Sequence, residues 1–254
     1  MKSSYGRGFI LLVLLLAIFY WVTPALAAPL QIPTVSFGVE STENPTEVST
    51  SLQILFLLTI LSLAPSILIM MTCFTRIIVV LHFTRTALAL QTMPPNQVLI
   101  GLTLFLTFFI MAPTWSAIND QALQPYLAGT LSQEQALEKA STPLREFMLK
   151  QTREKDLALF VNMSDMEQPQ TYRDIPIKVV IPAFILSELK TAFQIGAVIY
   201  LPFIVIDMIV GSVLMSMGMM MLPPMMISLP FKVLVFVLVD GWYLIVRSLI
   251  LSYQ

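Results

Sequence analysis

The chain has 254 residues, of which 57% are hydrophobic and 11% charged, and its net charge is −1. This composition, with a mean hydropathy of +0.82, excludes an ordinary soluble domain and is typical of a membrane protein. The near-neutral charge excludes the basic surface on which nucleic-acid binding depends. A single cysteine, Cys73, excludes an intrachain disulfide framework and a cysteine-based metal site, and a single histidine, His82, excludes a multi-histidine metal site within one chain.

Residues 1–27 are predicted to be a secretory signal peptide. They begin with positive charge, continue with an apolar run and end in a small-residue pattern, which predicts cleavage between Ala27 and Ala28. An uncleaved membrane anchor is the alternative, and Pro24 favours cleavage. A cleaved signal places the mature N-terminus outside the cytoplasm, where the Pro-, Ser-, Thr- and Glu-rich residues 28–50 are expected to form a poorly ordered external linker.

Residues 51–115 are predicted to form a first helical hairpin. The apolar run over 52–72 has about the 20 residues that a bilayer-crossing helix needs, and Pro65 inside it is expected to introduce a kink. A second apolar run covers 98–112. The two runs are therefore interpreted as two membrane-spanning arms.

The residues between these two arms contain a chain break and two arginines. Pro94 and Pro95 break the helical pattern, because proline lacks an N–H and restricts the residue before it. Arg76 and Arg85 are expected on the cytoplasmic side, where basic residues gather. This orientation agrees with an external N-terminus.

Residues 116–178 differ in composition, because they carry 16 of the chain's 29 formal charges. Ser132 with Gln135 three residues later matches a helix capping box. Thr142 followed by Pro143 matches a second helix start, with proline at the first helical position. These features predict a small helical periplasmic domain between two hairpins.

Residues 179–254 are predicted to form the second hairpin, which has a methionine-rich tip. Eight of the chain's sixteen methionines lie between 208 and 226, and they include Met219, Met220 and Met221. Pro223 and Pro224 end the helix that precedes them. A flexible thioether cluster suits a surface that re-packs around different partners. Composition alone leaves open the alternative of a Met-rich core between lipid-facing helices.

Several charged residues interrupt the apolar segments. A charge at the centre of a membrane helix costs at least about 2.5 kcal/mol, so such residues face a partner or water. Glu188 and Lys190 are two residues apart and point to different sides of a helix, which excludes a pair along one face. Arg247 is interpreted as snorkelling near the C-terminus. Contacts with another helix or another subunit are predicted for Arg76, Glu188, Lys190, Asp207, Lys232 and Asp240.

A weak internal repeat accompanies this pattern. Pro94-Pro95 and Pro223-Pro224 each separate two apolar arms, and repeated halves are common in membrane assemblies. A chance recurrence of Pro-Pro at helix ends is the alternative. The predicted fold is an all-α membrane protein with two long kinked hairpins, broken at Pro-Pro, and a small external helical domain between them.

The chain resembles the FliP family from about residue 50 to residue 254. The segments that carry the resemblance are 74–80, 94–102, 104–111, 184–193, 218–224, 229–232 and 237–242. The family forms the export gate of the flagellar type III secretion apparatus. Its injectisome relatives usually lack the cleavable signal and the long linker, so both features favour the flagellar branch.

The resemblance implies a helical homo-oligomer, a pentamer in the family, that winds with FliQ and FliR into a pore. It also implies contact with FlhA and FlhB, help from FliO during assembly, and a site in the bacterial inner membrane within the basal body. The family's methionine-rich loop seals the pore as a gasket, and it matches Met219, Met220 and Met221 here. Family structures hold much of the gate above the bilayer plane, so the apolar spans are expected to pack partly against subunits.

Two classes of function follow. The first is a gate that passes unfolded flagellar subunits, either in a flagellar or in an injectisome system. The second is a transporter of small solutes or ions that uses Asp207 and Glu188 as binding groups. Clustered methionine at a hairpin tip favours the gate. The sequence contains no phosphate loop, zinc-protease motif or nucleophile–base pair, so we expect neither enzymatic activity nor a cofactor or metal.

Overall fold

The computed structural model describes residues 45–164, 169, 171–219 and 221–253. The predicted signal peptide, with Ala27 and Ala28, lies outside these residues, and so does the predicted linker except for its last six residues. The chain divides into two units, Met1–Ile54 and Leu55–Gln254. The described residues of the first unit form the start of one helix, and the second unit contains the rest of that helix and all the others.

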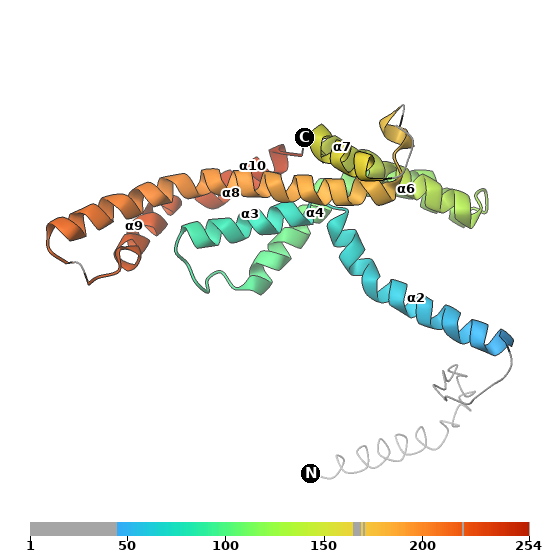
Figure 1. The fold of residues 1–254 in the computed structure, drawn as a ribbon, viewed down its shortest axis with the longest axis horizontal. Coiled ribbons are helices and arrows are strands. Elements are labelled where there is room, and N and C mark those ends of the chain that lie inside the picture. The colour runs from blue at the N-terminus through green and yellow to red at the C-terminus, as the bar shows by residue number, and fades with distance from the viewer. Residues whose placement is uncertain (1–44, 165–168, 170, 220, 254) are drawn as a thin grey trace, which may run out of the picture. The chain divides into compact units, whose positions relative to one another are not determined.

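The described residues form helices and contain no β-strand (Figure 1). In chain order these are α2 (Pro45–Met70), α3 (Phe74–Ala87), α4 (Asn96–Ile118), the π-helix η1 (Asn119–Leu123), α5 (Gln124–Leu127), α6 (Gln133–Gln151), α7 (Glu154–Met163), the 3-10 helix η2 (Tyr172–Asp174), α8 (Ile177–Ser216), α9 (Pro224–Leu238) and α10 (Gly241–Leu251). This helical content is consistent with an all-α membrane protein.

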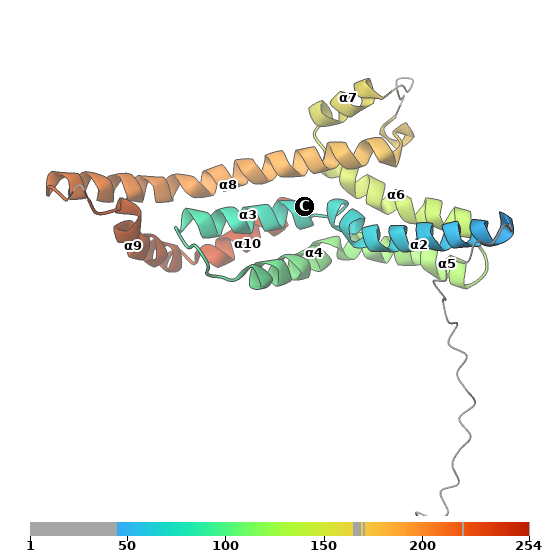
Figure 2. The ribbon, with the colours of Figure 1, turned by 60° about the horizontal axis from the view of Figure 1, so that its bottom comes forward.

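The first hairpin consists of α3 and α4, which pack on each other, and α3 also packs along α8 (Figures 1 and 2). The expectation that 52–72 forms one of its arms is wrong, because α2 ends at Met70 and α3 is a separate helix. Arg76 was expected in a connection between spans, whereas it lies on the buried face of α3. The hydropathy pattern does not reveal the break between α2 and α3, because the sequence is apolar on both sides of it.

The second hairpin consists of α8, which has 40 residues, and the pair α9–α10, which is bent by 62°. Gly218 follows the end of α8, after the C-cap residue Met217, and has φ +74°. Its N–H donates to the Met215 carbonyl, and the Met219 N–H donates to the Leu214 carbonyl, both at 3.0 Å. This is a Schellman motif, which needs a residue without Cβ strain at the left-handed position. Pro224 then begins α9 at the first helical position.

The tip of the first hairpin has the same order of features. Ala89 adopts φ +60° after α3, its N–H donates to the Thr86 carbonyl, and the Leu90 N–H donates to the Arg85 carbonyl. Pro95 then precedes the first residue of α4. Each hairpin therefore contains a helix, a left-handed cap, a short loop, a Pro-Pro pair and a second helix, a recurrence that favours an internal repeat over chance.

The polar segment contains one long helix where the sequence indicated two starts. The capping box predicted at Ser132 and Gln135 is confirmed, because both hydrogen bonds are present. The helix start predicted at Thr142–Pro143 is wrong, because α6 continues through both residues. The Thr142 hydroxyl donates back to the Glu138 carbonyl and so does not cap a new helix. Pro143 lies buried inside the helix.

Two helical stretches are long and apolar enough to cross a membrane, namely Asn96–Leu127 and Ile177–Ser216. The bent pair Pro224–Leu238 and Gly241–Leu251 forms a third candidate if the two helices act as one span. Within the described part of α2, the apolar run is shorter, Ile54–Ile67. Length and composition thus support two or three spans among the described residues, where the sequence suggested four.

Two apolar clusters position the candidate site. One joins α3, α4, α8 and α10 through buried side chains that include Ile77, Leu106, Ala192 and Leu249. The other joins α6, α7 and α8 and includes Met148 and Phe184. Because burial of apolar surface dominates folding, these clusters attach both the first hairpin and the polar segment to the long helix α8.

Candidate functional site

A buried ion pair lies where the first hairpin, α8 and the polar segment meet. The Arg76 guanidinium of α3 forms a salt bridge with the Glu188 carboxylate of α8, and a second bond joins Arg76 Nε to Glu188 Oε2 at 3.1 Å. Both side chains are almost completely buried. The pair is bidentate, the strongest arrangement for an arginine and a carboxylate.

The C-terminal residues complete this group, which we call the Arg76 cluster (Arg76, Gln151, Glu188, Ser252 and Tyr253). The Tyr253 hydroxyl donates to Glu188 Oε2 at 2.5 Å, and the Arg76 guanidinium lies 4.0 Å from the centre of the Tyr253 ring. Arg76 also donates to Gln151 Oε1 of α6 and to the Ser252 carbonyl and hydroxyl. Four segments of the chain are therefore joined through one buried guanidinium.

A second charged group connects the two hairpins near their tips. Lys232 of α9 is buried, and its Nζ lies 2.6 Å from Asp207 Oδ2 on α8. The Ser228 hydroxyl donates to the other oxygen of Asp207 at 2.5 Å. Lys232 also donates to the Ala87 carbonyl, the last of α3, at 3.3 Å. A cation at the C-terminus of a helix satisfies an unpaired carbonyl and complements the helix dipole.

Two of the residues predicted to make charge contacts, Lys190 and Asp240, form no ion pair among the described residues. Lys190 is exposed on α8, although its charge acts on Asp156 of α7. Asp240 is exposed and adopts φ 52° immediately before α10, where a negative charge complements the helix N-terminus. Within the described residues, neither side chain forms a salt bridge.

A third polar group, with Asp156 at its centre, holds the polar segment on α8. The Ser187 hydroxyl donates to Asp156 at 2.7 Å and accepts the Arg153 N–H at 3.1 Å. The Arg153 guanidinium forms a salt bridge with the same carboxylate. Burial raises the pKa of the Asp156 carboxyl, but the hydrogen bonds from Ser187 and Arg153 outweigh burial and hold that pKa below its usual value.

This lowered pKa predicts a loss of stability in acid. The contribution of Asp156 is complete above its unfolded pKa of about 3.9 and disappears as the pH falls through the lower folded pKa. We expect the melting temperature of the wild-type protein in detergent to exceed that of Asp156→Asn at neutral pH, and the difference to shrink below about pH 4. Asp120→Asn, at an exposed position on η1, is the matched control, and a pH-independent difference would contradict the prediction.

The methionine tip is exposed within the single chain. Met221 is 98% exposed, Met219 is 44% exposed, and Met217, Met225 and Met226 are also exposed. Met220 lies outside the described residues. The described methionines are thus available to pack against something other than their own chain, which disfavours the reading that they fill its core.

Sequence reasoning missed the structural roles of several residues in these groups and at the first hairpin tip. Arg85 is buried at the far end of α3, where it donates to Asn96 Oδ1 at 2.6 Å and to the Pro94 carbonyl, and so holds the first tip. Ser228 and Tyr253 carry no charge at neutral pH and sit in apolar stretches. Nothing in the hydropathy pattern distinguishes them from packing residues.

The single cysteine has no exposed thiol. Cys73 is fully buried, and burial raises the pKa of its thiol to about 12, so the thiol stays protonated at neutral pH. Among the described residues, no group of three or more His, Cys, Asp or Glu side chains could hold a metal ion.

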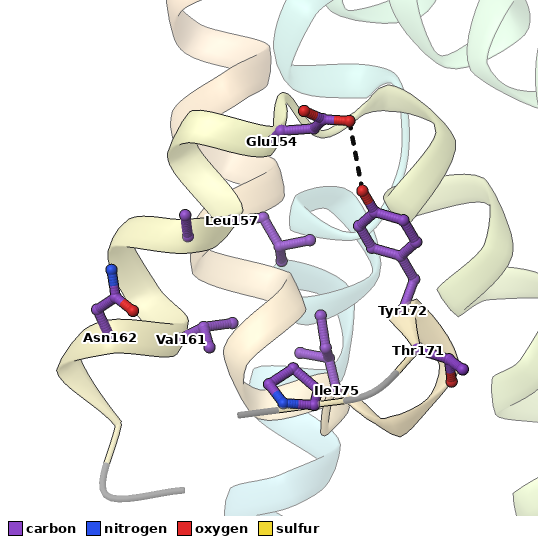
Figure 3. A pocket seen from close by; sticks show the side chains of 9 residues that line it. Glu154, Leu157, Val161, Asn162, Thr171, Tyr172 and Ile175 are labelled. Atoms are coloured by element: carbon purple, nitrogen blue, oxygen red, sulfur yellow. Dashed lines mark hydrogen bonds between the residues drawn. The ribbon is translucent and has the colours of Figure 1, made fainter. Parts of the chain in front are cut away.

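A pocket of about 450 Å³ lies between α7 and the segment that leads into α8 (Figure 3). The Tyr172 hydroxyl donates to Glu154 at 3.3 Å across it. Thr171, also on the lining, forms the capping box of η2: its side chain accepts from the Asp174 N–H, and its own N–H donates to the Asp174 carboxylate at 2.8 Å. These polar groups therefore serve local structure.

Comparison with known proteins gives consistent matches over this part of the chain. The model of the FliP family matches residues 57–249. The flagellar biosynthetic protein FliP of Bacillus subtilis is 63% identical over 216 residues, which cover 85% of this chain and 98% of the relative. The proteins of the same name from Pectobacterium carotovorum (54% identical over 203 residues, 80% and 79%) and Aquifex aeolicus (50% over 206 residues, 80% and 86%) are also similar. The range matched by the family model contains the positions of Arg76, Glu188, Asp207 and Lys232.

Proposed function

Since this chain belongs to the FliP family and is a flagellar biosynthesis protein of the export apparatus, we propose that it lines the pore of the export gate. Several copies surround one axis, and unfolded flagellar subunits pass between them across the inner membrane. A pentamer is the proposed assembly. FliQ and FliR are the proposed partners in the pore, with FlhA and FlhB beside it and FliO needed during assembly.

The exposed methionine tip is the observation that carries this proposal. The Schellman motif at Gly218 ends α8, and Pro223 caps α9, which begins at Pro224. The intervening loop is therefore fixed at both ends, while Met219 and Met221 within it remain exposed. Several copies bring many thioethers together. Their flexible side chains close around a passing polypeptide of any sequence and close again behind it, and the resulting apolar constriction excludes ions by dewetting.

A transporter of small solutes has less support. Such a protein needs available ionisable groups inside the membrane. The two carboxylates that would serve, Glu188 and Asp207, are engaged by Arg76 and Lys232 of the same chain. The proposed location is the bacterial inner membrane within the flagellar basal body, with the polar segment of residues 116–178 on the periplasmic side.

Replacement of Met219, Met220 and Met221 by alanine tests the gasket. Alanine keeps the surface apolar but removes its volume, so we expect a complex that assembles normally and conducts small ions. Conductance across membranes that contain the purified complex is the measurement. Met163→Ala, at a methionine that is 75% exposed on α7, is the matched control. Failure to assemble supports a packing role instead, and an intact complex as tight as the wild type contradicts the gasket.

A further inference from the structure

An apolar groove runs along α10, next to α4. Its volume is about 550 Å³. It is lined by Leu102 of α4 and by Trp242, Tyr243, Val246, Arg247 and Ile250 of α10. Among the described residues that line it, Arg247 is the only charged one. The groove is therefore suited to an occupant that is apolar over most of its length and anionic at one end.

Arg247 differs from the other cations of α3, α9 and α10. Arg76 binds Glu188, Arg85 binds Asn96, and Lys232 binds Asp207. Arg247 is exposed, and among the described residues it forms no salt bridge and donates no hydrogen bond. An ionisable residue in an apolar helix that could cross a membrane points to a partner, and the chain itself supplies none here.

The neighbouring side chains indicate which partner fits. Trp242 and Tyr243 flank the groove, and these two residue types gather at the headgroup level of bilayers. Arginine lays its aliphatic part along apolar surface and extends its charge toward the interface. Basic pockets between membrane helices bind anionic lipid headgroups.

We propose that this groove binds an anionic phospholipid, with an acyl chain along α10 and the lipid phosphate on the Arg247 guanidinium. The complementarity is twofold: the acyl chain matches the apolar lining, and the phosphate neutralises the unpaired cation through bidentate hydrogen bonds. This inference rests on the membrane location of the protein and is independent of the methionine gasket, so either can fail alone.

Trp242 provides a reporter inside the groove. The chain has three tryptophans, Trp21, Trp115 and Trp242. Trp21 lies in the predicted signal peptide, so Trp115→Phe combined with Trp21→Phe leaves Trp242 as the only tryptophan of this chain whether or not the signal is cleaved. This variant, purified with its partner subunits, is reconstituted into phosphatidylcholine vesicles that contain brominated phosphatidylglycerol, or brominated phosphatidylcholine at the same fraction. We expect phosphatidylglycerol to be the stronger quencher, with about a fivefold preference, which corresponds to about 1 kcal/mol per basic residue.

Substitutions at Arg247 separate headgroup recognition from simple contact with lipid. Arg247→Gln should abolish the preference while both lipids still quench Trp242, and Arg247→Lys should retain part of it. Lys155→Gln, at an exposed position on α7, should leave it unchanged. Equal quenching by both lipids in the parent variant overturns the anionic site. Absence of quenching by either lipid also overturns the proposal, because a neighbouring subunit then covers the groove.

Discussion

Replacing Glu188 by alanine is expected to destabilise the protein by about 3–5 kcal/mol, because it leaves the Arg76 guanidinium buried without its counter-charge. This is a large share of the 5–15 kcal/mol that holds a typical protein folded. The loss extends beyond one contact, since Arg76 also holds Gln151 and Ser252 in place. Yield of the assembled complex and cell motility should therefore fall together.

A double replacement distinguishes the charge imbalance from the loss of a specific contact. Arg76→Met with Glu188→Leu removes both charges and fills the site with apolar side chains, an exchange that is often neutral or stabilising for buried pairs. We expect it to recover much of the stability lost in Glu188→Ala. Glu138→Ala, at an exposed position on α6, is the control for the loss of one carboxylate. Wild-type complex yield and motility in Glu188→Ala would refute a role for the Arg76 cluster in assembly.

Replacing Gly196 by leucine should separate α3 from α8. A Cβ at Gly196 would lie 2.6 Å from Cγ and Cδ2 of the Phe83 ring and 3.1 Å from its Cβ. The ring cannot turn away freely, because it packs edge-to-face against Phe193 and Tyr200. Overpacking of this kind usually lowers the stability of a protein by about 1–3 kcal/mol and occasionally by more. We expect Gly196→Leu at the upper end of that range, because the leucine side chain has no space beside the Phe83 ring.

The same helix pair supplies both a rescue and a control. Phe83→Ala removes the ring that the leucine meets, so the double mutant Gly196→Leu, Phe83→Ala should be less destabilised than the sum of its single changes. Gly101→Leu on α4 has nothing within 4 Å of an added Cβ and should be neutral or gain up to about 1 kcal/mol from helix propensity. Thermal unfolding of the four variants in detergent is the measurement, and additive effects would show that the two residues do not clash.

The residues that point to an export gate could be recognised in the sequence. Apolar runs, the Pro-Pro pairs and the methionines from 208 to 226 each follow from local chemistry: proline ends helices, and a thioether cluster at a helix end is uncommon enough to notice. The family motifs made the same region identifiable. The exposure of Met221 at the tip, however, depends on how α8 and α9 turn around it, which no local pattern specifies.

The partners of the buried charges were decided only by tertiary structure. The sequence by itself determined that Glu188 and Lys232 need partners, because an unpaired charge in an apolar helix is costly. It left those partners open, since Arg76 is 112 residues from Glu188 and Tyr253 is 65 residues from it. The break between α2 and α3 was hidden for a related reason: both helices are apolar, and hydropathy does not record where an apolar chain changes direction.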